Sequence, residues 1–567
     1  MIGHNSPISG VACWGDTYVA TAGYDNQVIL WDAATRTART RVLHDHLANQ
    51  CSFSPDGKWL VTSSSDYSAR LWSVPDLRLR AVLDAHDDDV EMSVFHPDKE
   101  LIATASRDHR VRVFDFNGAV VATFRGHTAD VISVEWAADG DTLISSSDDG
   151  TIKRWSLASG ELVGDINMDG VETDTVVLTP GGTIYAGNDE GDIVTVRPDG
   201  SRTTVQAHDA GVKRLVLGAS RGLLVSLSYD RTVKLWDTSG SRLGHVATNS
   251  IPDDVWPRSC AFGGGSTLVF GTFGRTYRTF DYEQGSWDET PVPPTYGVNA
   301  VTPHGAPGDA LMVGDAGIVW REDDRGGGRQ EVARTGSLCN FLTPAGDLVL
   351  AGGQLGKVFD ALTGRVLHQH RSPLNCGARF TRDGVEHVVV GAYTGEGLLF
   401  RLDGDSATHM RDLPLLQNAV KGVAVGERLL FAVCADYSAT WWDIETLECV
   451  RTVRYAHDRI VNGCVSLGGD RFASVGRDLT VRIWSADGDA DVIPAPHPNS
   501  IKCVSASADG TTVATGDYHG MIALLDVSSR SWVRTYRPTT SGISSLSYDD
   551  ATKTFLASSY DGNVYRI

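Results

Sequence analysis

The feature that most constrains the fold of this chain is a short pattern that recurs along it. An Asp in a turn-forming stretch is followed six residues later by a Trp that ends a β-rich run, as in GYDNQVILWD at residues 23–32. A further copy, residues 107–115, has Phe114 in place of the Trp. Such self-similarity predicts an array of like units rather than one large core. The six gap-free pairs are Asp25 and Trp31, Asp66 and Trp72, Asp149 and Trp155, Asp230 and Trp236, Asp436 and Trp442, and Asp478 and Trp484.

A second element lies 21 or 22 residues before the turn Asp in most copies. It is a His followed by apolar residues four, seven and often nine positions later, as in His127, Val131, Val134 and Trp136. Turn signals such as SPDGKW at 54–59 separate the two elements, and a further strand such as LRLRAVL at 77–83 follows. The alternation has a period of two, which predicts strands and an all-β fold. The other histidines of this kind are His4, His44, His86, His208 and His457.

These two elements resemble the WD40 repeat. The resemblance rests on the upstream His, which Gly precedes at Gly3-His4 and Gly126-His127, and on the closing Trp-Asp at 31–32, 236–237 and 442–443. The repeat period of about 40 residues agrees with that family. The resemblance implies β-propeller blades, each a four-stranded antiparallel sheet arranged around an axis.

In WD40 blades the His, the turn Asp, a strand Ser or Thr and the Trp form a buried hydrogen-bonded tetrad. The resemblance therefore implies a structural role for these residues, because buried polar groups need partners. In the copy that ends at Trp155, the hydroxyl would come from Ser145 or Ser147. The tetrad residues assigned in this way are His4, Asp25 and Trp31; His44, Asp66 and Trp72; His127, Asp149 and Trp155; His208, Asp230 and Trp236; and His457, Asp478 and Trp484.

Weaker copies of the pattern fill the intervals between the regular ones and bring the total to about fourteen units. Because a propeller ring typically holds four to eight blades, this total predicts two tandem seven-bladed WD40-like propellers of four-stranded antiparallel blades. The stretch GSWDETPVPPTYG at 285–297 is rich in Pro and lacks the blade pattern. We therefore place the N-terminal propeller at residues 1–291 and the C-terminal propeller at residues 292–567.

The number of strands leaves one blade incomplete. With four strands per blade, the chain is one strand short of two full rings. Residues 287–292 either form the fourth strand of the seventh blade, which is the assignment we prefer, or pair with the last blade. In both cases one blade has three strands, and an edge along residues 563–567 would be open to a strand from another chain.

Composition limits the classes of function. The net charge of −21 disfavours sequence-independent binding to nucleic acid and association with anionic membranes. No apolar run approaches the roughly 20 residues of a transmembrane helix, and no signal peptide is visible, so we expect a cytoplasmic protein. None of the nine cysteines forms a C-x-x-C pair, which indicates core thiols. The excess of Arg over Lys suggests a GC-rich, bacterial genome.

Other motifs do not indicate a cofactor or a metal. Residues 323–331, DDRGGGRQE, lack the strand–loop–helix context and the GK[ST] ending of a phosphate-binding loop. The acidic run Asp87, Asp88 and Asp89 lacks the spacing of a calcium loop. The His pairs at 44 and 46 and at 368 and 370 lack further ligands at zinc spacing. We expect neither a bound cofactor nor a bound metal.

The residue just before each turn Asp is the best candidate for contact with a partner. If the resemblance holds, this position lies at the mouth of the ring face that commonly binds partners. Tyr and Arg are frequent there and are enriched in interface hot spots, although Tyr also suits the end of a strand. The candidates are Tyr24, Arg107, Asp148 and Tyr229 in the first ring and Arg477, Tyr518 and Tyr560 in the second.

The sequence favours a non-enzymatic protein-interaction scaffold or adaptor, because propeller loops can vary without cost to the core. The acidic balance favours protein partners with neutral or basic surfaces. Two alternatives stay open at this point. One is a regulatory or sensor subunit of a bacterial signalling or specialised-metabolism enzyme complex, and the other is an enzyme with its active site at a propeller mouth.

Overall fold

The computed structural model describes residues 2–293, 295–323 and 328–567. Within these residues the regular structure consists of strands and a single 3-10 turn, η1 (Ala219–Arg221). The described strands form thirteen four-stranded sheets and one three-stranded sheet, and all pairings are antiparallel between neighbours in sequence. The predicted all-β class with four-stranded blades is confirmed. Part of the Gly-rich stretch 323–331 lies outside the described residues.

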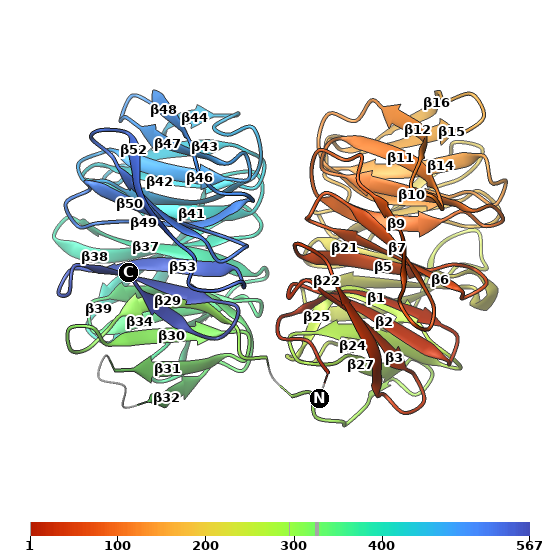
Figure 1. The fold of residues 1–567 in the computed structure, drawn as a ribbon, viewed down its shortest axis with the longest axis horizontal. Helices are drawn as coiled ribbons and strands as arrows, with labels where there is room; N and C mark the ends of the chain where they lie inside the picture. The colour runs from red at the N-terminus through yellow and green to blue at the C-terminus, as the bar shows by residue number, and fades with distance from the viewer. Residues whose placement is uncertain (1, 294, 324–327) are drawn as a thin grey trace. The chain divides into compact units, whose positions relative to one another are not determined.

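The chain divides into two compact units, residues 1–295 and 296–567. The first unit contains seven sheets, which we call blades 1 to 7 (Figure 1). Their strands are, blade by blade, β1 (Ile8–Trp14), β2 (Tyr18–Gly23), β3 (Gln27–Asp32), β4 (Ala38–Leu43); β5 (Ala48–Phe53), β6 (Trp59–Ser64), β7 (Ala69–Ser73), β8 (Leu79–Leu83); β9 (Val90–Phe95), β10 (Leu101–Ser106), β11 (Arg110–Asp115), β12 (Val120–Arg125); β13 (Val131–Trp136), β14 (Thr142–Ser147), β15 (Thr151–Ser156), β16 (Leu162–Asn167); β17 (Thr175–Leu178), β18 (Ile184–Gly187), β19 (Asp192–Val196), β20 (Arg202–Gln206); β21 (Val212–Gly218), β22 (Leu223–Ser228), β23 (Thr232–Asp237), β24 (Gly244–Ser250); and β25 (Val255–Phe262), β26 (Thr267–Thr272), β27 (Arg278–Asp281), β28 (Ser286–Trp287).

The second unit contains the remaining seven sheets, blades 8 to 14. Their strands are β29 (Val298–Pro303), β30 (Ala310–Gly314), β31 (Ile318–Glu322), β32 (Arg329–Arg334); β33 (Cys339–Ala345), β34 (Leu348–Gly353), β35 (Lys357–Asp360), β36 (Val366–Gln369); β37 (Leu374–Arg382), β38 (Val385–Ala392), β39 (Glu396–Asp403), β40 (Ser406–Pro414); β41 (Val420–Val425), β42 (Leu429–Cys434), β43 (Ala439–Asp443), β44 (Cys449–Val453); β45 (Val461–Ser466), β46 (Phe472–Gly476), β47 (Thr480–Trp484), β48 (Ala490–Pro494); β49 (Ile501–Ala506), β50 (Thr512–Asp517), β51 (Ile522–Asp526), β52 (Ser531–Tyr536); and β53 (Ile543–Asp549), β54 (Thr554–Ser559), β55 (Val564–Arg566).

The first strand of each blade is the inner strand, and each unit closes into a ring through these strands. In the first unit β1 lies beside β25, and the Val11 N–H donates to the Ser259 hydroxyl at 2.9 Å (Figure 1). In the second unit β29 lies beside β53, and the Ser544 hydroxyl donates to the Val298 carbonyl. The first and last blades of each unit are therefore neighbours, as the two seven-bladed propellers require.

Side chains near the start of the inner strands also connect adjacent blades. Asn49 of blade 2 donates its amide to the Val90 carbonyl of blade 3 at 3.0 Å. Three Asn side chains of the second unit make the same type of bond to the next blade, at 2.7–2.9 Å: Asn340 to Leu374, Asn375 to Val420 and Asn462 to Ile501. These polar contacts supplement the apolar clusters that fill the space between blades.

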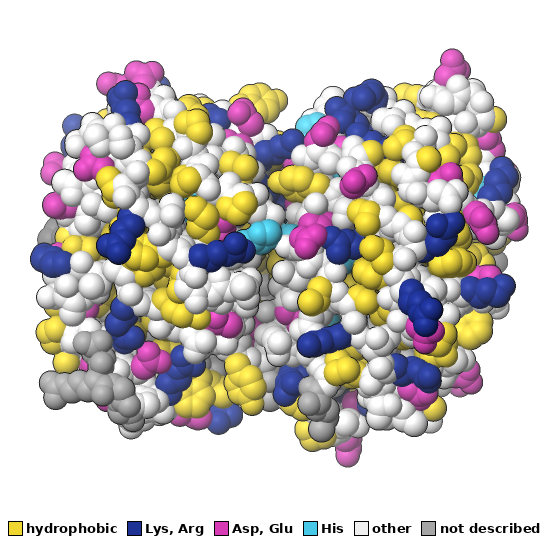
Figure 2. All heavy atoms as spheres, viewed as in Figure 1, with side chains coloured by type: hydrophobic (Ala, Val, Ile, Leu, Met, Phe, Trp, Pro, Cys, Tyr) yellow, Lys and Arg dark blue, Asp and Glu magenta, His cyan; other side chains and the backbone are white. Residues whose placement is uncertain are grey.

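The fourth strands face outward and alternate between half-buried and exposed side chains, as in β4 and β16. Their aliphatic residues are unusually exposed, with Leu43, Val121, Val163 and Val533 between 51 and 61 % exposed. Figure 2 shows hydrophobic side chains interspersed with charged ones on the visible face. Single exposed apolar residues of this kind are normal at protein surfaces.

The structure places the boundary between the units a few residues after the predicted one at 291 and 292. The Pro293 carbonyl accepts the Arg275 N–H at 2.8 Å, and the Thr295 hydroxyl donates to the Phe273 carbonyl at 3.0 Å. Val292 packs so closely on Gly274 that a Cβ at this glycine would lie 2.1 Å from the valine side chain. These contacts tie the start of the predicted second domain to blade 7 of the first.

The three-stranded sheet is blade 14, β53–β54–β55. The expected fourth strand of blade 7 exists as β28, but it is only two residues long and pairs Phe280 with Trp287 and Asp281 with Ser286. The preferred assignment of the segment near Trp287 is therefore confirmed, although most of residues 287–292 is not strand. At β55, Arg566 donates to the Gly308 carbonyl at 3.0 Å and lies 3.3 Å from Glu322 in blade 8.

The buried polar network of blade 4 shows what holds a blade in register. Trp155 Nε1 donates to the Ser145 hydroxyl at 2.9 Å, and this hydroxyl lies 2.8 Å from His127 Nε2. His127 Nδ1 lies 2.8 Å from the Asp149 carboxylate. Because the hydroxyl accepts from the indole, its own proton is directed to Nε2, and Nδ1–H then donates to Asp149. The hydroxyl comes from Ser145, whereas Ser147 donates to the Ala129 carbonyl.

The same network recurs in four more blades with Thr21, Thr62, Ser226 and Ser474 as the hydroxyl groups. The residues brought together are His4, Asp25 and Trp31; His44, Asp66 and Trp72; His208, Asp230 and Trp236; and His457, Asp478 and Trp484.

Two blades keep the network without the Trp. In blade 3, His86 contacts Asp108 and Thr104 while the buried Phe114 replaces the indole. In blade 13, His497 lies 3.0 Å from Asp517 and 2.7 Å from Thr515. The sequence did not predict this second set, because Asp517 stands two positions earlier in its turn than the other aspartates do.

We expect unequal costs from two substitutions in blade 4. His127→Leu leaves the Asp149 carboxylate without its imidazole donor in a buried site and should cost about 3 kcal/mol of unfolding free energy. Trp155→Phe keeps the contacts of His127 and imitates blade 3, so it should cost only about 1 kcal/mol. Urea denaturation of the two variants checks this order. Equal costs would contradict the network account.

Candidate functional site

A recurrent backbone hydrogen bond places the residue before each turn Asp at the start of the inner strand. The N–H groups of Tyr24, Arg107 and Asp148 donate to the carbonyls of Pro7, Asp89 and Asp130 at 2.9–3.0 Å. In the second unit, Arg477 and Tyr560 donate in the same way to Ile460 and Gly542 at 2.9 and 3.1 Å. We call this end of each ring its mouth.

Arg107 is the centre of an ion-pair network at the first mouth. Its guanidinium pairs with Glu91 of the same blade and lies 2.6 Å from Asp130 of blade 4. Although burial acts in the opposite direction, Arg107 and Arg258 hold the pKa of the Glu91 carboxyl below its usual value. The Arg107 side chain therefore connects two blades at the mouth, and it is also a candidate for contact with a partner.

Tyr24 belongs to an aromatic and cationic cluster beside this network. Its ring meets Trp256 edge-on at 5.2 Å, and the Arg258 guanidinium lies 5.9 Å from the Tyr24 ring and 5.4 Å from the Trp256 ring. Arg258 Nη2 also lies 3.7 Å from Glu91. Blades 7 and 3 stand on opposite sides of the ring, so this ion pair crosses the ring axis.

Tyr229 and the acidic side of the mouth meet at Lys213. The Lys213 ammonium lies 2.5 Å from Asp174, pairs with Asp189 and lies 5.6 Å from the Tyr229 ring centre. Because Lys213 is in blade 6 while both aspartates are in blade 5, these ion pairs join two blades. The four predicted residues of the first mouth thus occupy one continuous set of charged and aromatic side chains.

The first mouth has more carboxylates than cations around Asp148. Burial and the neighbouring Glu172, Asp130 and Asp174 raise the pKa of Asp148 well above its usual value, against the opposing effect of Arg107. A carboxylate in this position is repelled by its neighbours, so the local charge favours a cation from another molecule.

Below the mouth, Arg214 of blade 6 reaches across the axis. Its guanidinium donates to Met92 Sδ of blade 3 at 3.7 Å, and the nearby Glu135 carboxyl has its pKa raised to about 7 by burial. Side chains therefore occupy the axis of the first ring at two levels, at Arg258 and at Arg214.

The second mouth has a different character. The Lys421 ammonium lies 5.1 Å from the Tyr393 ring, and the Lys502 ammonium lies 6.0 Å from the Tyr518 ring. The predicted Tyr518 and Tyr560 come together at Gly542, where an added Cβ would lie 3.1 Å from atoms of both. Together with Arg477, these residues give the second mouth cations and tyrosine rings.

The sequence reasoning missed the residues that partner the predicted ones, although a signal was present. Glu91, Lys213 and Lys502 each stand five positions after a tetrad histidine, namely His86, His208 and His497. The same position carries Asn49 and Asn462, which connect adjacent blades. If the repeats are aligned on the histidine, the residue five positions after it is seen to differ from blade to blade, as the residue before the turn Asp does.

Several charged groups of the first mouth pair with one another, at Arg107, Lys213 and Arg258. Within the described part of the chain, no group of three or more His, Cys, Asp or Glu side chains is arranged to hold a metal ion. Burial raises the pKa of the Cys51 and Cys260 thiols to about 12, so neither supplies a thiolate near neutral pH. No helix among the described residues has the length and apolar character needed to cross a membrane.

We expect Asp148→Asn to stabilise the protein. The raised pKa means that the folded state holds the Asp148 proton more tightly than the unfolded state, so wild-type stability falls as pH rises above the usual pKa of an aspartate. The variant removes this loss. At pH 7.5 its free energy of unfolding should be about 1 kcal/mol higher than that of the wild type and its melting temperature about 2 °C higher, whereas near pH 4 the two proteins should be almost equal. Thermal unfolding at both pH values is the measurement, with the exposed Asp209→Asn as control. A gain that is equal at both values, or a loss, would contradict the like-charge account.

Comparison with known proteins agrees with the structure. The model of the family described as WD domain, G-beta repeat matches six segments, residues 1–32, 38–73, 77–115, 118–156, 200–237 and 447–485. Each segment contains the first three strands of one blade, namely blades 1 to 4, 6 and 12, and the later segments begin at the fourth strand of the blade before. These six blades hold six of the seven His–Asp networks described above.

Three relatives illustrate the similarity. The chain is 26 % identical over 278 residues to the transcriptional corepressor LEUNIG_HOMOLOG of Arabidopsis thaliana, with 40 % of this chain and 35 % of the relative covered. It is 30 % identical over 196 residues to the nuclear distribution protein nudF of Aspergillus niger, with 30 % and 44 % covered. It is 24 % identical over 233 residues to the target of rapamycin complex subunit wat1 of Schizosaccharomyces pombe, with 39 % and 74 % covered.

The match spans less than half the length of the first two relatives. All three relatives come from eukaryotes and do not support the bacterial origin expected from codon bias. The six matched segments, the buried networks and the propeller blades together show that this chain contains WD40 repeats.

Proposed function

We propose that this protein is a non-enzymatic protein-interaction scaffold whose two mouths bind different partners. The observation that carries the proposal is the contrast between the mouths. The first combines Tyr24, Arg107 and Tyr229 with an excess of carboxylates around Asp148, and the second combines Arg477 with Lys421 and Lys502 and tyrosine rings. Tyr and Arg are frequent hot-spot residues, and local charge selects the partner.

The first mouth suits a partner segment that carries Lys or Arg. A basic side chain at Asp148 would relieve the repulsion between this carboxylate and Glu172, Asp130 and Asp174. The ordered aromatic pair of Tyr24 and Trp256 would supply apolar area nearby. The local charge therefore supports a neutral or basic partner for the first mouth, and Arg477, Lys421 and Lys502 support an acidic one for the second.

Three considerations support a scaffold over an enzyme at the mouth. The acidic and basic groups of the first mouth are committed to each other through Arg107, Lys213 and Arg258. Arg214 and Met92 fill the axis below them. Two of the relatives are named as a corepressor and as a complex subunit, and both names describe proteins that act together with other proteins. A cytoplasmic location and the absence of a cofactor stay predictions.

Arg107 is an unsuitable residue for the binding test, because its removal would leave Glu91 and Asp130 without their main cation. The double variant Asp148→Asn and Glu172→Gln avoids this problem, since it removes charge from the repelling group and should not lower stability.

The test selects phage-displayed peptides on the full wild-type chain and then measures binding of the enriched peptides to both proteins. We expect Lys- or Arg-containing peptides that bind the double variant at least about tenfold more weakly, a loss of about 1.4 kcal/mol. A control variant that removes one charge at the opposite end of the first ring, Asp98→Asn in the exposed β9–β10 turn, should bind like the wild type. Equal binding of the basic peptides to the double variant would reject the first mouth as their site.

A further inference from the structure

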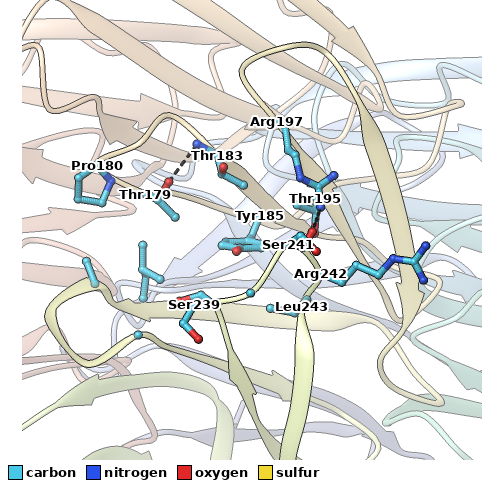
Figure 3. A pocket seen from close by; sticks show the side chains of 15 residues that line it. Thr179, Pro180, Thr183, Tyr185, Thr195, Arg197, Ser239, Ser241, Arg242 and Leu243 are labelled. Atoms are coloured by element: carbon cyan, nitrogen blue, oxygen red, sulfur yellow. Dashed lines mark hydrogen bonds between the residues drawn. The ribbon is translucent and has the colours of Figure 1, made fainter.

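The space between blades 5 and 6, at the ring end opposite the mouth, contains a pocket of about 370 Å³ (Figure 3). Its walls come from the β17–β18 turn, the facing strands β18 and β19, and the β23–β24 turn. Because one water occupies about 30 Å³ of liquid volume, the pocket has room for a small organic molecule.

The pocket replaces an apolar contact that other blades make. Tyr185 of β18 and Thr195 of β19 are direct cross-strand partners, so both side chains lie on the same face of the sheet. When the blades are aligned on the turn residue of positive φ, this pair corresponds to Ile144 and Arg154 in blade 4 and to purely apolar pairs in four other blades of the first ring. The apolar pairs are Ala20 and Leu30 in blade 1, Val61 and Leu71 in blade 2, Ala103 and Val113 in blade 3, and Val225 and Leu235 in blade 6.

Both hydroxyl groups of the polar pair lack protein partners. Thr195 is 3 % exposed and Tyr185 is 5 % exposed. Within the described residues, neither hydroxyl has a hydrogen-bond partner. The Thr195 hydroxyl is fully buried, and a buried hydroxyl without a partner costs about 1–3 kcal/mol. Both side chains line the pocket, so a bound molecule would give each hydroxyl a partner.

The charge of the lining selects anions. The fifteen lining residues include Arg197 and Arg242 and no Asp or Glu, in a chain whose net charge is −21. Arg197 donates one hydrogen bond to the Ser241 carbonyl and keeps its other N–H groups for a ligand. Two acidic groups lie outside the lining: Asp237 accepts the Ser239 N–H at 2.8 Å, and hydrogen bonds from Ser201 together with the charge of Arg197 lower the pKa of Asp199. In Figure 3, Tyr185, Thr195 and Arg197 gather at the centre, while the Arg242 side chain extends away.

We propose that this pocket binds a small hydroxylated anion of the sugar-phosphate class, with Arg197 at the phosphate and the Tyr185 and Thr195 hydroxyls at sugar oxygens. The seven hydroxyl-bearing residues of the lining suit a ligand rich in hydroxyl groups: Thr179, Thr183, Tyr185, Thr195, Thr238, Ser239 and Ser241. The inference goes beyond the scaffold function and does not depend on it, because the pocket lies at the end of the first ring opposite its mouth.

Titration calorimetry of the full chain with three probes tests the ligand class. A hexose 6-phosphate should bind with a Kd below about 1 mM, inorganic phosphate at least about tenfold more weakly, and the unphosphorylated hexose more weakly still. No heat from the hexose phosphate at about 10 mM would overturn the proposal. Equal affinity for inorganic phosphate would also overturn it, because the hydroxyl groups would then contribute nothing.

Four single variants test the site itself. Arg197→Gln should weaken binding of the hexose phosphate by about tenfold or more. Arg125→Gln, a matched control at an exposed arginine of blade 3 outside the pocket, should leave it unchanged. Thr195→Val and Tyr185→Phe should each weaken it by about threefold or more. Neither hydroxyl variant should lower the melting temperature of the ligand-free protein, because no hydrogen bond is lost. Unchanged binding in Arg197→Gln, Thr195→Val and Tyr185→Phe would overturn the site. A melting temperature several degrees lower in Thr195→Val would overturn it as well.

Discussion

The contact between a buried imidazole and a turn carboxylate is the interaction on which the rest of this structure depends. In blade 4, His127 lies on the connection that leads into the inner strand, and Asp149 lies in the turn between β14 and β15. The same carboxylate accepts the Thr128 and Thr151 N–H groups at 3.0 and 2.9 Å. One satisfied network therefore fixes both the strand register and the two loops that form the mouth.

Because the buried network fixes the loops of the mouth, the exposed residues of these loops can differ from blade to blade without cost to the core. The first mouth uses this freedom for ion pairs between blades, at Arg107 and at Lys213, and the second mouth uses it for Lys and Tyr pairs. Blade 5 lacks the His and the Trp, and it is also the blade in which Tyr185 and Thr195 replace an apolar contact. A departure from the repeat thus coincides with a candidate ligand site.

The sequence predicted the blades, the two rings and the five complete networks because each depends on residues at fixed spacing, such as Asp149 and Trp155. It did not predict the His497 and Asp517 contact, since the turn Asp there is shifted by two positions. It placed the unit boundary too early, because the contacts of Pro293 and Thr295 with blade 7 have no local signal. The pairing of Glu91 with Arg258 arises from ring closure, which brings together residues that are far apart in the chain.

The central claim is that the mouth of the first ring, positioned by the buried networks, is a binding surface for basic segments. Amide hydrogen exchange of the full chain with and without a bound basic peptide tests it most directly. We predict added protection at residues 129–131, 148–150 and 171–175, which carry Asp130, Asp148, Glu172 and Asp174, and none in the outward-facing strands β12 and β16. Protection confined to these outer strands, with the mouth segments unchanged, would contradict the account.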